Sequence, residues 1–211
     1  MKSLILIGAG DFGLEVWSWL NEAKGYNKEY AFKGFLDANL EALSENRFCN
    51  AHILCSPSEY NIQSNDVFVC TIGDPSAKKK VVSDMLMKGA QFINLVHSSV
   101  IEFQNVKYGS GVIVSPNCVI SNNAEIKSHV SINLFCSIGH DTVIGECSVL
   151  SSHCDVTGGV IIGDEVMLGS RVTIIPRVSI VNGAVLGAGA VIMRSVKQKG
   201  TYVGNPAMKI L

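Results

Sequence analysis

Residues 130–150 decide the fold, and they read VSINLFCSIGHDTVIGECSVL. A large aliphatic residue stands at every sixth position of this stretch, at Ile132, Ile138, Ile144 and Leu150. Two positions before each of them stands a small or β-branched residue. The aliphatic series continues in phase from position 114 to position 192, and the small series from position 100 to position 196. A repeat this long predicts a stacked architecture, because each short unit buries its apolar face only against its neighbours.

The period itself predicts the shape of each unit. Side chains two positions apart on a strand point to the same side, so both series are expected to fill one interior. A period of six then indicates a short strand and a corner, with three such segments closing a triangular coil of a parallel β-helix. A β-sandwich varies in strand length and turn spacing, and a helix has a period of 3.6, so the fixed period argues against both. Five glycines follow an aliphatic residue, and we expect them to adopt a positive φ at the corners: Gly139, Gly145, Gly163, Gly169 and Gly187.

The N-terminal part has a different pattern. We expect strands at residues 3–7, 31–36, 66–72 and 90–95, and helices at residues 14–23 and 75–88. This β-α-β order predicts an α/β domain with a small parallel sheet. The expected division is residues 1–95 for this domain, residues 96–196 for the coil and residues 197–211 for a C-terminal tail. Residues 39–65 are weakly patterned and stay unassigned.

A glycine-rich loop, GAGDFG at residues 8–13, follows the first strand and opens the first helix. Free N–H groups at a helix start attract anions, and Asp37 at the end of the next strand offers a carboxylate to a ribose or a base. The pattern favours a nucleotide-phosphate site, with tight strand–helix packing as the alternative. The domain is smaller than most dinucleotide-binding domains, which disfavours NAD. Asp11 is an awkward neighbour for a phosphate, because like charges repel.

Composition limits the class of protein. Hydrophobic residues make up 47% of the 211 residues and charged residues 17%, so we expect much of the surface to be buried in an oligomer. A net charge of -1 gives no electrostatic case for nucleic acid or anionic membrane. The apolar runs are too short to span a bilayer. Seven scattered cysteines without a C-x-x-C pair predict free thiols in a reducing cytoplasm, with no disulfide frame and no metal site.

Among the five histidines, His140 has the surroundings of a catalyst. It lies in Ile138-Gly-His-Asp141, and a histidine with a carboxylate partner is suited to act as a general base near neutral pH. A plain surface corner fits the spacing equally well. His52, His97, His129 and His153 are expected to be solvated or structural. The basic residues near the C-terminus suit either the phosphates of a long anionic cofactor or a solvated rim, and they are Arg171, Arg177, Arg194, Lys197, Lys199 and Lys209.

Taken together, the two halves resemble the PglD/NeuD-type bacterial sugar acetyltransferases, which join a small Rossmann-like domain to a left-handed β-helix of hexapeptide repeats. The resemblance covers nearly the whole chain. Its matching stretches are residues 8–13 (GAGDFG), 34–37 (GFLD), 72–73 (IG), 94–97 (NLVH), 133–141 (NLFCSIGHD), 158–159 (GG), 168–170 (LGS), 187–189 (GAG) and 203–207 (VGNPA).

The resemblance implies a homotrimer with active sites between neighbouring coils and acetyl-CoA as cosubstrate. His140 matches the catalytic base, Asp141 its acidic partner and Asn133 an active-site asparagine. Gly158 matches the N–H that receives the thioester oxyanion. Ser170 and Ala188 match backbone positions along the CoA arm. The residues that match the nucleotide-sugar pocket are Gly10, Asp11, Phe12, Asp37, Ala38 and Gly73.

The chain departs from the family pattern at three places. Val149 stands where some members have a second active-site histidine, and Asp11-Phe12 stands where some have Gly-His. Ala38 replaces an acidic or polar residue, so the nucleotide base stays open among UDP, dTDP and GDP. The leading hypothesis is a cytoplasmic N-acetyltransferase that acts on a nucleotide-linked 4-amino-4,6-dideoxy sugar in surface-glycan biosynthesis. The alternatives are a sugar O-acetyltransferase of the sialic acid type and a non-catalytic, trimeric nucleotide-binding scaffold.

Overall fold

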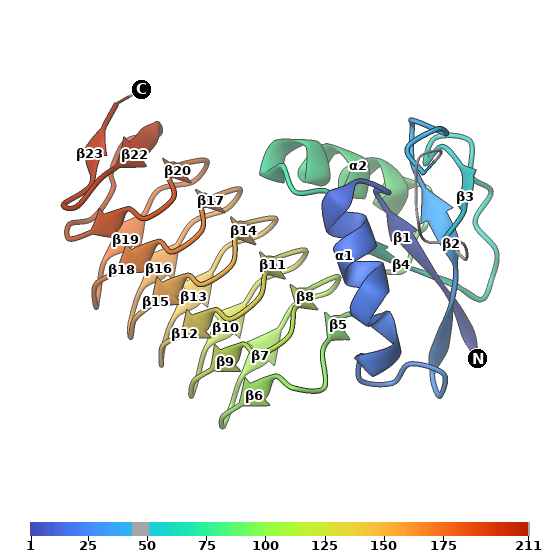
Figure 1. Ribbon diagram of the computed structural model, residues 1–211, viewed down its shortest axis with the longest axis horizontal. Coiled ribbons are helices and arrows are strands. Elements are labelled where there is room, and N and C mark those ends of the chain that lie inside the picture. The colour runs from blue at the N-terminus through green and yellow to red at the C-terminus, as the bar shows by residue number, and fades with distance from the viewer. Residues whose placement is uncertain (44–50, 211) are drawn as a thin grey trace.

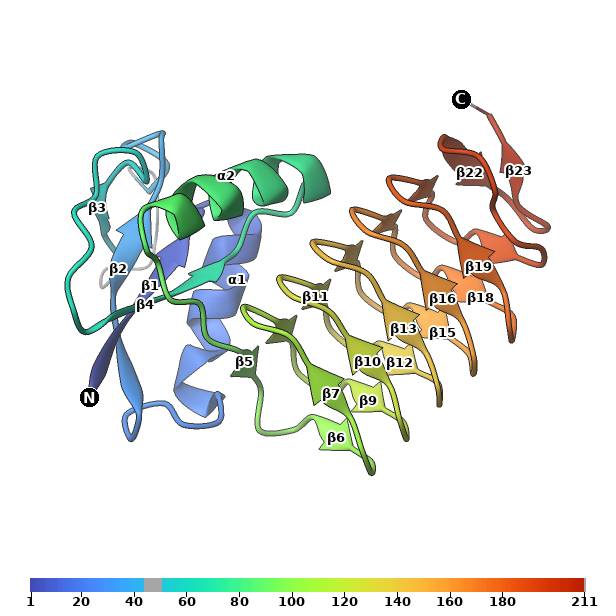
Figure 2. The same ribbon diagram turned by 180° about the vertical axis from the view of Figure 1, so that it is seen from behind.

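The computed structural model describes residues 1–43 and 51–210. A small α/β domain lies beside the first turns of a long coil of two-residue strands, and one of its helices reaches along the coil (Figures 1 and 2). The N-terminus belongs to the α/β domain, and the C-terminus lies at the far end of the coil. The predicted architecture, an α/β domain followed by a parallel β-helix, is confirmed.

The α/β domain contains one parallel sheet with the strand order β3-β2-β1-β4. Its strands are β1 (Lys2–Ile7), β2 (Tyr30–Leu36), β3 (Ile53–Cys55) and β4 (Asp66–Cys70). Its helices are α1 (Asp11–Trp19), continued by the 3-10 turn η1 (Leu20–Glu22), and α2 (Pro75–Met87). Leu4 and Leu6 pack with α1, whereas Ile5 and Ile7 pack with α2. The two helices therefore cover opposite faces of the sheet, and β1 is apolar throughout because both of its faces are buried.

Three of the four strands predicted in this domain are confirmed with small shifts at their ends. The predicted strand at residues 90–95 is wrong. Only Phe92 forms a bridge to the sheet, and β5 (Leu95–Val96) already pairs with the coil. The first helix begins at Asp11 and not at residue 14, because Gly10 takes the N-cap and Gly13 lies inside the first turn.

The coil is built from three sheets whose strands run parallel, except for one antiparallel pair at the C-terminal end. Up to residue 192 their paired residues are 18 positions apart, so three six-residue repeats make one turn. The eight-stranded sheet contains, in chain order, β5, β8 (Ile113–Val114), β11 (Ser131–Ile132), β14 (Val149–Leu150), β17 (Met167–Leu168), β20 (Val185–Leu186), β22 (Thr201–Val203) and β23 (Met208–Lys209). The strands lie side by side in the same order, from β5 at one end of the sheet to β23 at the other.

The six-stranded sheet contains β6 (Ile101–Glu102), β9 (Val119–Ile120), β12 (Ser137–Ile138), β15 (Asp155–Val156), β18 (Thr173–Ile174) and β21 (Val191–Ile192). The five-stranded sheet contains β7 (Lys107–Tyr108), β10 (Glu125–Ile126), β13 (Val143–Ile144), β16 (Ile161–Ile162) and β19 (Ser179–Ile180). Side chains of the aliphatic and small series from all three sheets form one continuous core, as the periodicity predicted.

The structure contradicts the positive φ that was expected for five corner glycines. Gly139, Gly145, Gly163, Gly169 and Gly187 do not adopt a positive φ. The positive φ falls two residues later in each repeat, where glycine, asparagine, histidine and arginine recur, as at Asn123 (φ 60°), and where Asp141 has a φ of 57°. The five glycines are needed for a different reason. A Cβ on any of them would overlap an atom of the next coil, so they allow the coils to stack closely.

This distinction predicts the cost of two substitutions. A Cβ on Gly145 would lie 2.5 Å from the backbone nitrogen of Asp164, while Gly189 has a φ of 71° and open space around it. We expect Gly145→Ala to reduce the free energy of unfolding by about 3 kcal/mol through overpacking. Gly189→Ala should cost about 1 kcal/mol through its backbone conformation. Urea denaturation of both variants measures the difference, and the reverse order would contradict the steric role of Gly145.

Buried polar contacts fasten the α/β domain to the coil. Lys78 on α2 is fully buried, and its Nζ donates to Ser131 Oγ at 2.6 Å and to the His129 carbonyl oxygen at 3.3 Å. Burial lowers the pKa of Lys78 to about 8. Lys79 forms an ion pair with Glu165, two turns further along the coil. These contacts hold α2 against the eight-stranded sheet.

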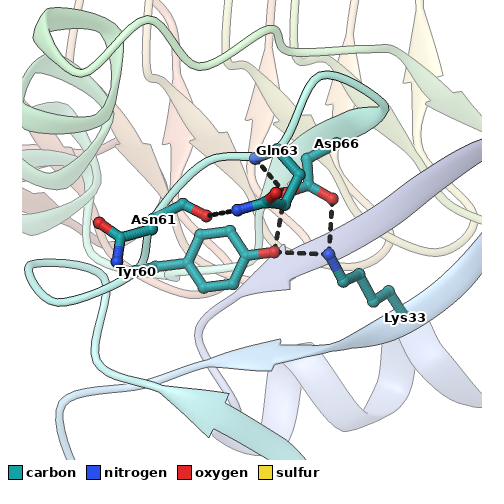
Figure 3. Close-up of polar contacts among 5 residues, drawn as sticks. All are labelled: Lys33, Tyr60, Asn61, Gln63 and Asp66. Atoms are coloured by element: carbon teal, nitrogen blue, oxygen red, sulfur yellow. Dashed lines mark hydrogen bonds and ion pairs between the residues drawn. The ribbon is translucent and has the colours of Figure 1, made fainter.

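A second polar network holds β2 to β4 across β1 (Figure 3). Lys33 Nζ donates to Asp66 Oδ1 at 2.8 Å and to Tyr60 Oη at 2.7 Å. Asp66 Oδ2 accepts from the Tyr60 hydroxyl at 2.7 Å and from the Gln63 N–H at 2.8 Å. Burial alone would raise the pKa of Asp66, but the hydrogen bonds from Lys33, Gln63 and Tyr60 outweigh it and hold this pKa below its ordinary value.

The lowered pKa of Asp66 gives a stability prediction with a definite sign. An Asp66→Asn variant should lose about 2 kcal/mol at pH 7, because the buried donors lose their charged acceptor. A carboxyl whose folded pKa is depressed stabilises the fold above its unfolded pKa of about 4 and loses that contribution as pH falls through the folded pKa. Urea titrations should therefore show a constant gap between wild type and variant above about pH 5, and the gap should close as pH falls below about 4. A gap that does not change with pH would contradict the assignment.

Candidate active site

The three sheets meet along three edges of the coil, and two of these edges contain the predicted catalytic and cofactor residues. We call the edge between the six-stranded and five-stranded sheets the histidine edge, formed by residues 103–106, 121–124, 139–142, 157–160 and 175–178. We call the edge between the eight-stranded and six-stranded sheets the serine edge, formed by residues 115–118, 133–136, 151–154, 169–172 and 187–190.

His140 and Asp141 form a hydrogen-bonded pair on the histidine edge. His140 Nδ1 lies 2.7 Å from Asp141 Oδ2, and both side chains are largely exposed, at 66% and 57%. Asp141 has a φ of 57°, the conformation of the corner residue in each repeat. Hydrogen bonds from His140 and then from Asn123 lower the pKa of Asp141. The carboxylate therefore stays ionised, and it can hold a proton on Nδ1 while Nε2 remains free as a base.

Gly158 lies in the next coil directly beneath the imidazole of His140. A Cβ at Gly158 would stand 2.7 Å from Cε1 and 2.9 Å from Cδ2 of the ring, and closer still to Nε2. A Cβ at Gly139 would stand 2.5 Å from the Gly158 nitrogen. Gly158 thus leaves the space in which the ring lies, and Gly139 allows the two coils to approach closely there. None of the backbone hydrogen bonds of the described residues uses the Gly158 N–H, so this donor is available beside Nε2.

Asn133, Ser170 and Ala188 lie on the serine edge, not beside His140. The Asn133 Oδ1 accepts from the Leu134 N–H at 2.7 Å. Ser170 and Ala188 occupy equivalent corners of successive coils, and the Gly189 N–H donates to the Ser170 carbonyl at 2.8 Å. Within one chain, the structure therefore divides the predicted catalytic and cofactor residues between two edges, with His140, Asp141 and Gly158 on one and the other three on the second.

The predicted nucleotide residues gather at the carboxyl edge of the sheet in the α/β domain. Asp37 follows β2, and its Oδ2 accepts from the Ala9 N–H at 2.7 Å in the glycine-rich loop after β1. Its Oδ1 accepts from the Asn39 N–H at 2.8 Å. Thr71 follows β4, and its hydroxyl donates to the Gly8 carbonyl at 2.7 Å. These bonds bring the ends of three parallel strands together, which is where open α/β sheets bind ligands.

The glycines of this loop have different roles. A Cβ at Gly13 would overlap the Gly8 carbonyl oxygen, so Gly13 serves the tight packing of helix on strand. Gly10 is the N-cap of α1 and has no atom within 4 Å of an added Cβ, so it leaves open space at the helix start. Asp11 and Ala38 are exposed beside it, while Phe12 is half-buried against the core.

Gly73 adjoins a pocket of 570 Å³ between the start of α2 and the coil. Asp74 caps α2 by accepting from the Ala77 N–H at 2.8 Å. The lining residues are Gly73, Asp74, Pro75, Ser76, Glu165, Met167, Gly183, Val185 and Lys199. The coil residues among them were not predicted from the sequence. The repeat phase places Met167 and Val185 on the outer face of the eight-stranded sheet, but no sequence signal shows that α2 covers that face.

The histidine edge lies opposite the surface that the α/β domain covers. Lys78 contacts the eight-stranded sheet and Leu95 belongs to it. His140 lies where the other two sheets meet. A ligand held at the carboxyl edge of the α/β domain is therefore separated from His140 of the same chain by the coil. Of the basic residues, Arg171 lies on the serine edge and Arg177 on the histidine edge, both exposed.

Neither a metal centre nor a membrane span is seen in the described part of the chain. No group of three or more His, Cys, Asp and Glu side chains in residues 1–43 and 51–210 could hold a metal ion. No helix within the same ranges is both long enough and apolar enough to cross a bilayer. Six cysteines in these ranges have free thiols, and Cys49 lies outside them.

Residues 3–85 match the family model described as the PglD N-terminal domain. This segment, which is the α/β domain, is therefore similar to the PglD N-terminal domain. No curated protein sequence matches the chain. The resemblance to PglD-type proteins is thereby confirmed in the α/β domain, whose glycine-rich loop, Asp37 and Gly73 all fall within the matched residues.

Solved structures resemble the α/β domain and the coil together. The acetyltransferase domain of PglB from Neisseria gonorrhoeae FA1090 has a TM-score of 0.85 at 20% identity, and the match covers 100% of both chains. WeeI from Acinetobacter baumannii AYE has a TM-score of 0.87 at 23% identity, again over 100% of both chains. PerB from Caulobacter crescentus, solved with CoA and GDP-perosamine, has a TM-score of 0.88 at 22% identity over 100% of this chain and 98% of that one. These similarities establish the fold.

Proposed function

We propose that this protein is an acetyl-CoA-dependent N-acetyltransferase that acts on a nucleotide-linked 4-amino-4,6-dideoxy sugar in surface-glycan biosynthesis. One observation carries the proposal. The His140–Asp141 pair leaves Nε2 of His140 free beside the unused N–H of Gly158. The fold supports it, because a structure of that fold, PerB, was solved with CoA and GDP-perosamine.

The chemistry follows from these groups. The sugar amine attacks the thioester carbonyl carbon, and His140 Nε2 accepts the proton that the nitrogen loses as the C–N bond forms. The Gly158 N–H stabilises the oxyanion of the tetrahedral intermediate, a contribution of about 3 kcal/mol in comparable sites. The intermediate then expels the CoA thiolate, which takes the proton from the imidazolium as the C–S bond breaks. No covalent bond to the enzyme is formed.

We propose that two copies of the chain build each site. The α/β domain covers its own eight-stranded sheet, and His140 lies on the opposite edge. A nucleotide bound to one chain must therefore meet His140 of a neighbour, as in the homotrimer that the resemblance implies. Such packing would also bring the serine edge of one copy, with Asn133, Ser170 and Ala188, to the histidine edge of another, where it would complete the acetyl-CoA site.

The nucleotide is assigned to the carboxyl edge of the α/β domain. The open space at Gly10 permits a phosphate to approach the start of α1, and the exposed Ala38 and half-exposed Asp37 are available to the ribose or base. Gly73 belongs both to this edge and to the pocket against the coil. A sugar attached to the bound nucleotide would extend into that pocket. The free thiols of the described cysteines fit the reducing cytoplasm, where we place the enzyme.

The test is a screen for CoA release. Purified protein is incubated with acetyl-CoA and with UDP-, dTDP- and GDP-linked 4-amino-4,6-dideoxy sugars, and the product is identified by mass spectrometry. We expect turnover with at least one acceptor and none with the matching 4-hydroxy sugar. Turnover of the hydroxy sugar would reassign the protein as an O-acetyltransferase. Absence of turnover together with absence of acetyl-CoA binding by calorimetry would support a non-catalytic scaffold.

A further inference from the structure

A ladder of amide side chains leads along the histidine edge to the catalytic pair. Asn105 Nδ2 donates to Asn123 Oδ1 at 3.2 Å, and Asn123 Nδ2 donates to Asp141 Oδ1 at 2.9 Å. The three residues occupy the same corner position in successive coils, with φ of 61°, 60° and 57°. Their backbones are tied in parallel, since the Asn123 N–H donates to the Gln104 carbonyl and the Asp141 N–H to the Asn122 carbonyl. Side chains of equivalent residues therefore stack one above the other.

The direction of the ladder is set by chemistry. An ionised carboxylate only accepts hydrogen bonds, so Asn123 must turn its NH₂ group towards Asp141. The carbonyl oxygen of that amide then faces Asn105, which must donate in turn. At the other end, Asp141 Oδ1 is occupied by Asn123, and Oδ2 faces His140 Nδ1. The carboxylate in this rotamer requires a proton on Nδ1.

We propose that Asn123 is a positioning residue, a role that rests on the function proposed above. Its amide, aligned by Asn105, holds Asp141 in one rotamer. That rotamer of Asp141 fixes Nε2 of His140 above Gly158. The catalytic pair needs such a positioning residue because both of its side chains are exposed. The side chains of His140 and Asp141 are 66% and 57% exposed, so packing alone does not hold them. Hydrogen bonds to both carboxylate oxygens restrict the rotation of Asp141, and Asp141 restricts the imidazole.

Two substitutions at Asn123 separate positioning from folding. Asn123→Gly removes the amide and suits the φ of 60°, so the coil should keep its fold. Asn123→Asp keeps the shape but replaces the NH₂ donor with a second carboxylate oxygen beside Asp141. The matched control is Asn117→Gly, which removes the same side chain at a φ of 61° from the serine edge. Thermal unfolding should show similar midpoints for Asn123→Gly and Asn117→Gly.

The first readout is ¹⁵N NMR of the histidine rings without substrate. We expect wild type and Asn117→Gly to show neutral His140 protonated on Nδ1, and Asn123→Gly to show a mixture of the two tautomers. Asn123→Asp lacks the same NH₂ donor and should also show a mixture of the two tautomers. An unchanged His140 tautomer in both Asn123 variants would overturn the proposal.

The second readout is the pH profile of acetyl transfer. Asn123→Gly should lower kcat about tenfold, the size expected for one hydrogen bond to a charged group, with little change in KM. Asn123→Asp, which lacks the same NH₂ donor, should lower kcat by a similar factor across the profile. A wild-type profile in both variants would overturn the proposal. The NMR readout requires no turnover, so failure of the proposed function would appear as inactive wild type and is separable from failure of the positioning role.

Discussion

Replacing His140 with alanine is expected to reduce kcat/KM for acetyl transfer about 1,000-fold. A positioned general base contributes roughly 10²–10⁴-fold, and His140 has a carboxylate at 2.7 Å that fixes its Nδ1 proton. The residual rate should come from binding and from the Gly158 N–H. The measurement is steady-state CoA release at pH 8 with the acceptor found in the screen.

The control for His140→Ala is His52→Ala, an exposed histidine that lies far along the chain from the coil. We expect it to keep wild-type activity. Calorimetry should also show that His140→Ala binds acetyl-CoA with near wild-type affinity, because the base acts on the proton of the acceptor. A His140→Ala variant within fivefold of wild type would exclude His140 as the base.

The Gly158→Ala variant is expected to lose about 100-fold in kcat while keeping its fold. Its new Cβ would collide with the tip of the His140 ring, which is an exposed, movable side chain, so the coil need not shift. We expect a change of less than about 1 kcal/mol in the free energy of unfolding. The catalytic loss arises because Nε2 is displaced from the reacting atoms and from the N–H donor at residue 158.

The comparison for Gly158→Ala is Gly189→Ala, a glycine on the serine edge with open space around it. Urea denaturation and steady-state kinetics should be measured on both variants. If Gly158→Ala unfolds the coil and Gly189→Ala does not, Gly158 is required for the stacking of the coils. If Gly158→Ala keeps both fold and activity, the imidazole does not need the space above residue 158.

The coil was predictable from the sequence because its order is local and repeated. Each core position of the six-residue phase recurs at a fixed interval, so Ile138 and Leu168 could be placed in the interior without knowledge of the tertiary structure. The role of the corner glycines was predicted incorrectly. Their constraint comes from the next turn of the coil, as for Gly145 against the Gly163 backbone 18 residues further on. A pattern read along one turn does not show the spacing between turns.

The candidate site was only partly predictable. The residues after β1, β2 and β4 could be expected to meet, because carboxyl ends of parallel strands share one edge. The position of the α/β domain on the coil could not, since it depends on contacts such as the burial of Lys78 against Ser131. A lysine on an amphipathic helix ordinarily predicts a solvated face. For the same reason the sequence did not indicate the pocket beside Gly73, which requires α2 and the coil together.

The most direct test is a crystal structure of the protein with CoA and the nucleotide-linked amino sugar found in the screen. We expect the nucleotide to lie at the carboxyl edge of one chain's α/β domain. The sugar amine should lie within hydrogen-bond reach of Nε2 of His140 from a neighbouring chain. The CoA thiol should lie beside the N–H of Gly158. A structure in which sugar and CoA meet away from His140, or within a single chain, would contradict the account.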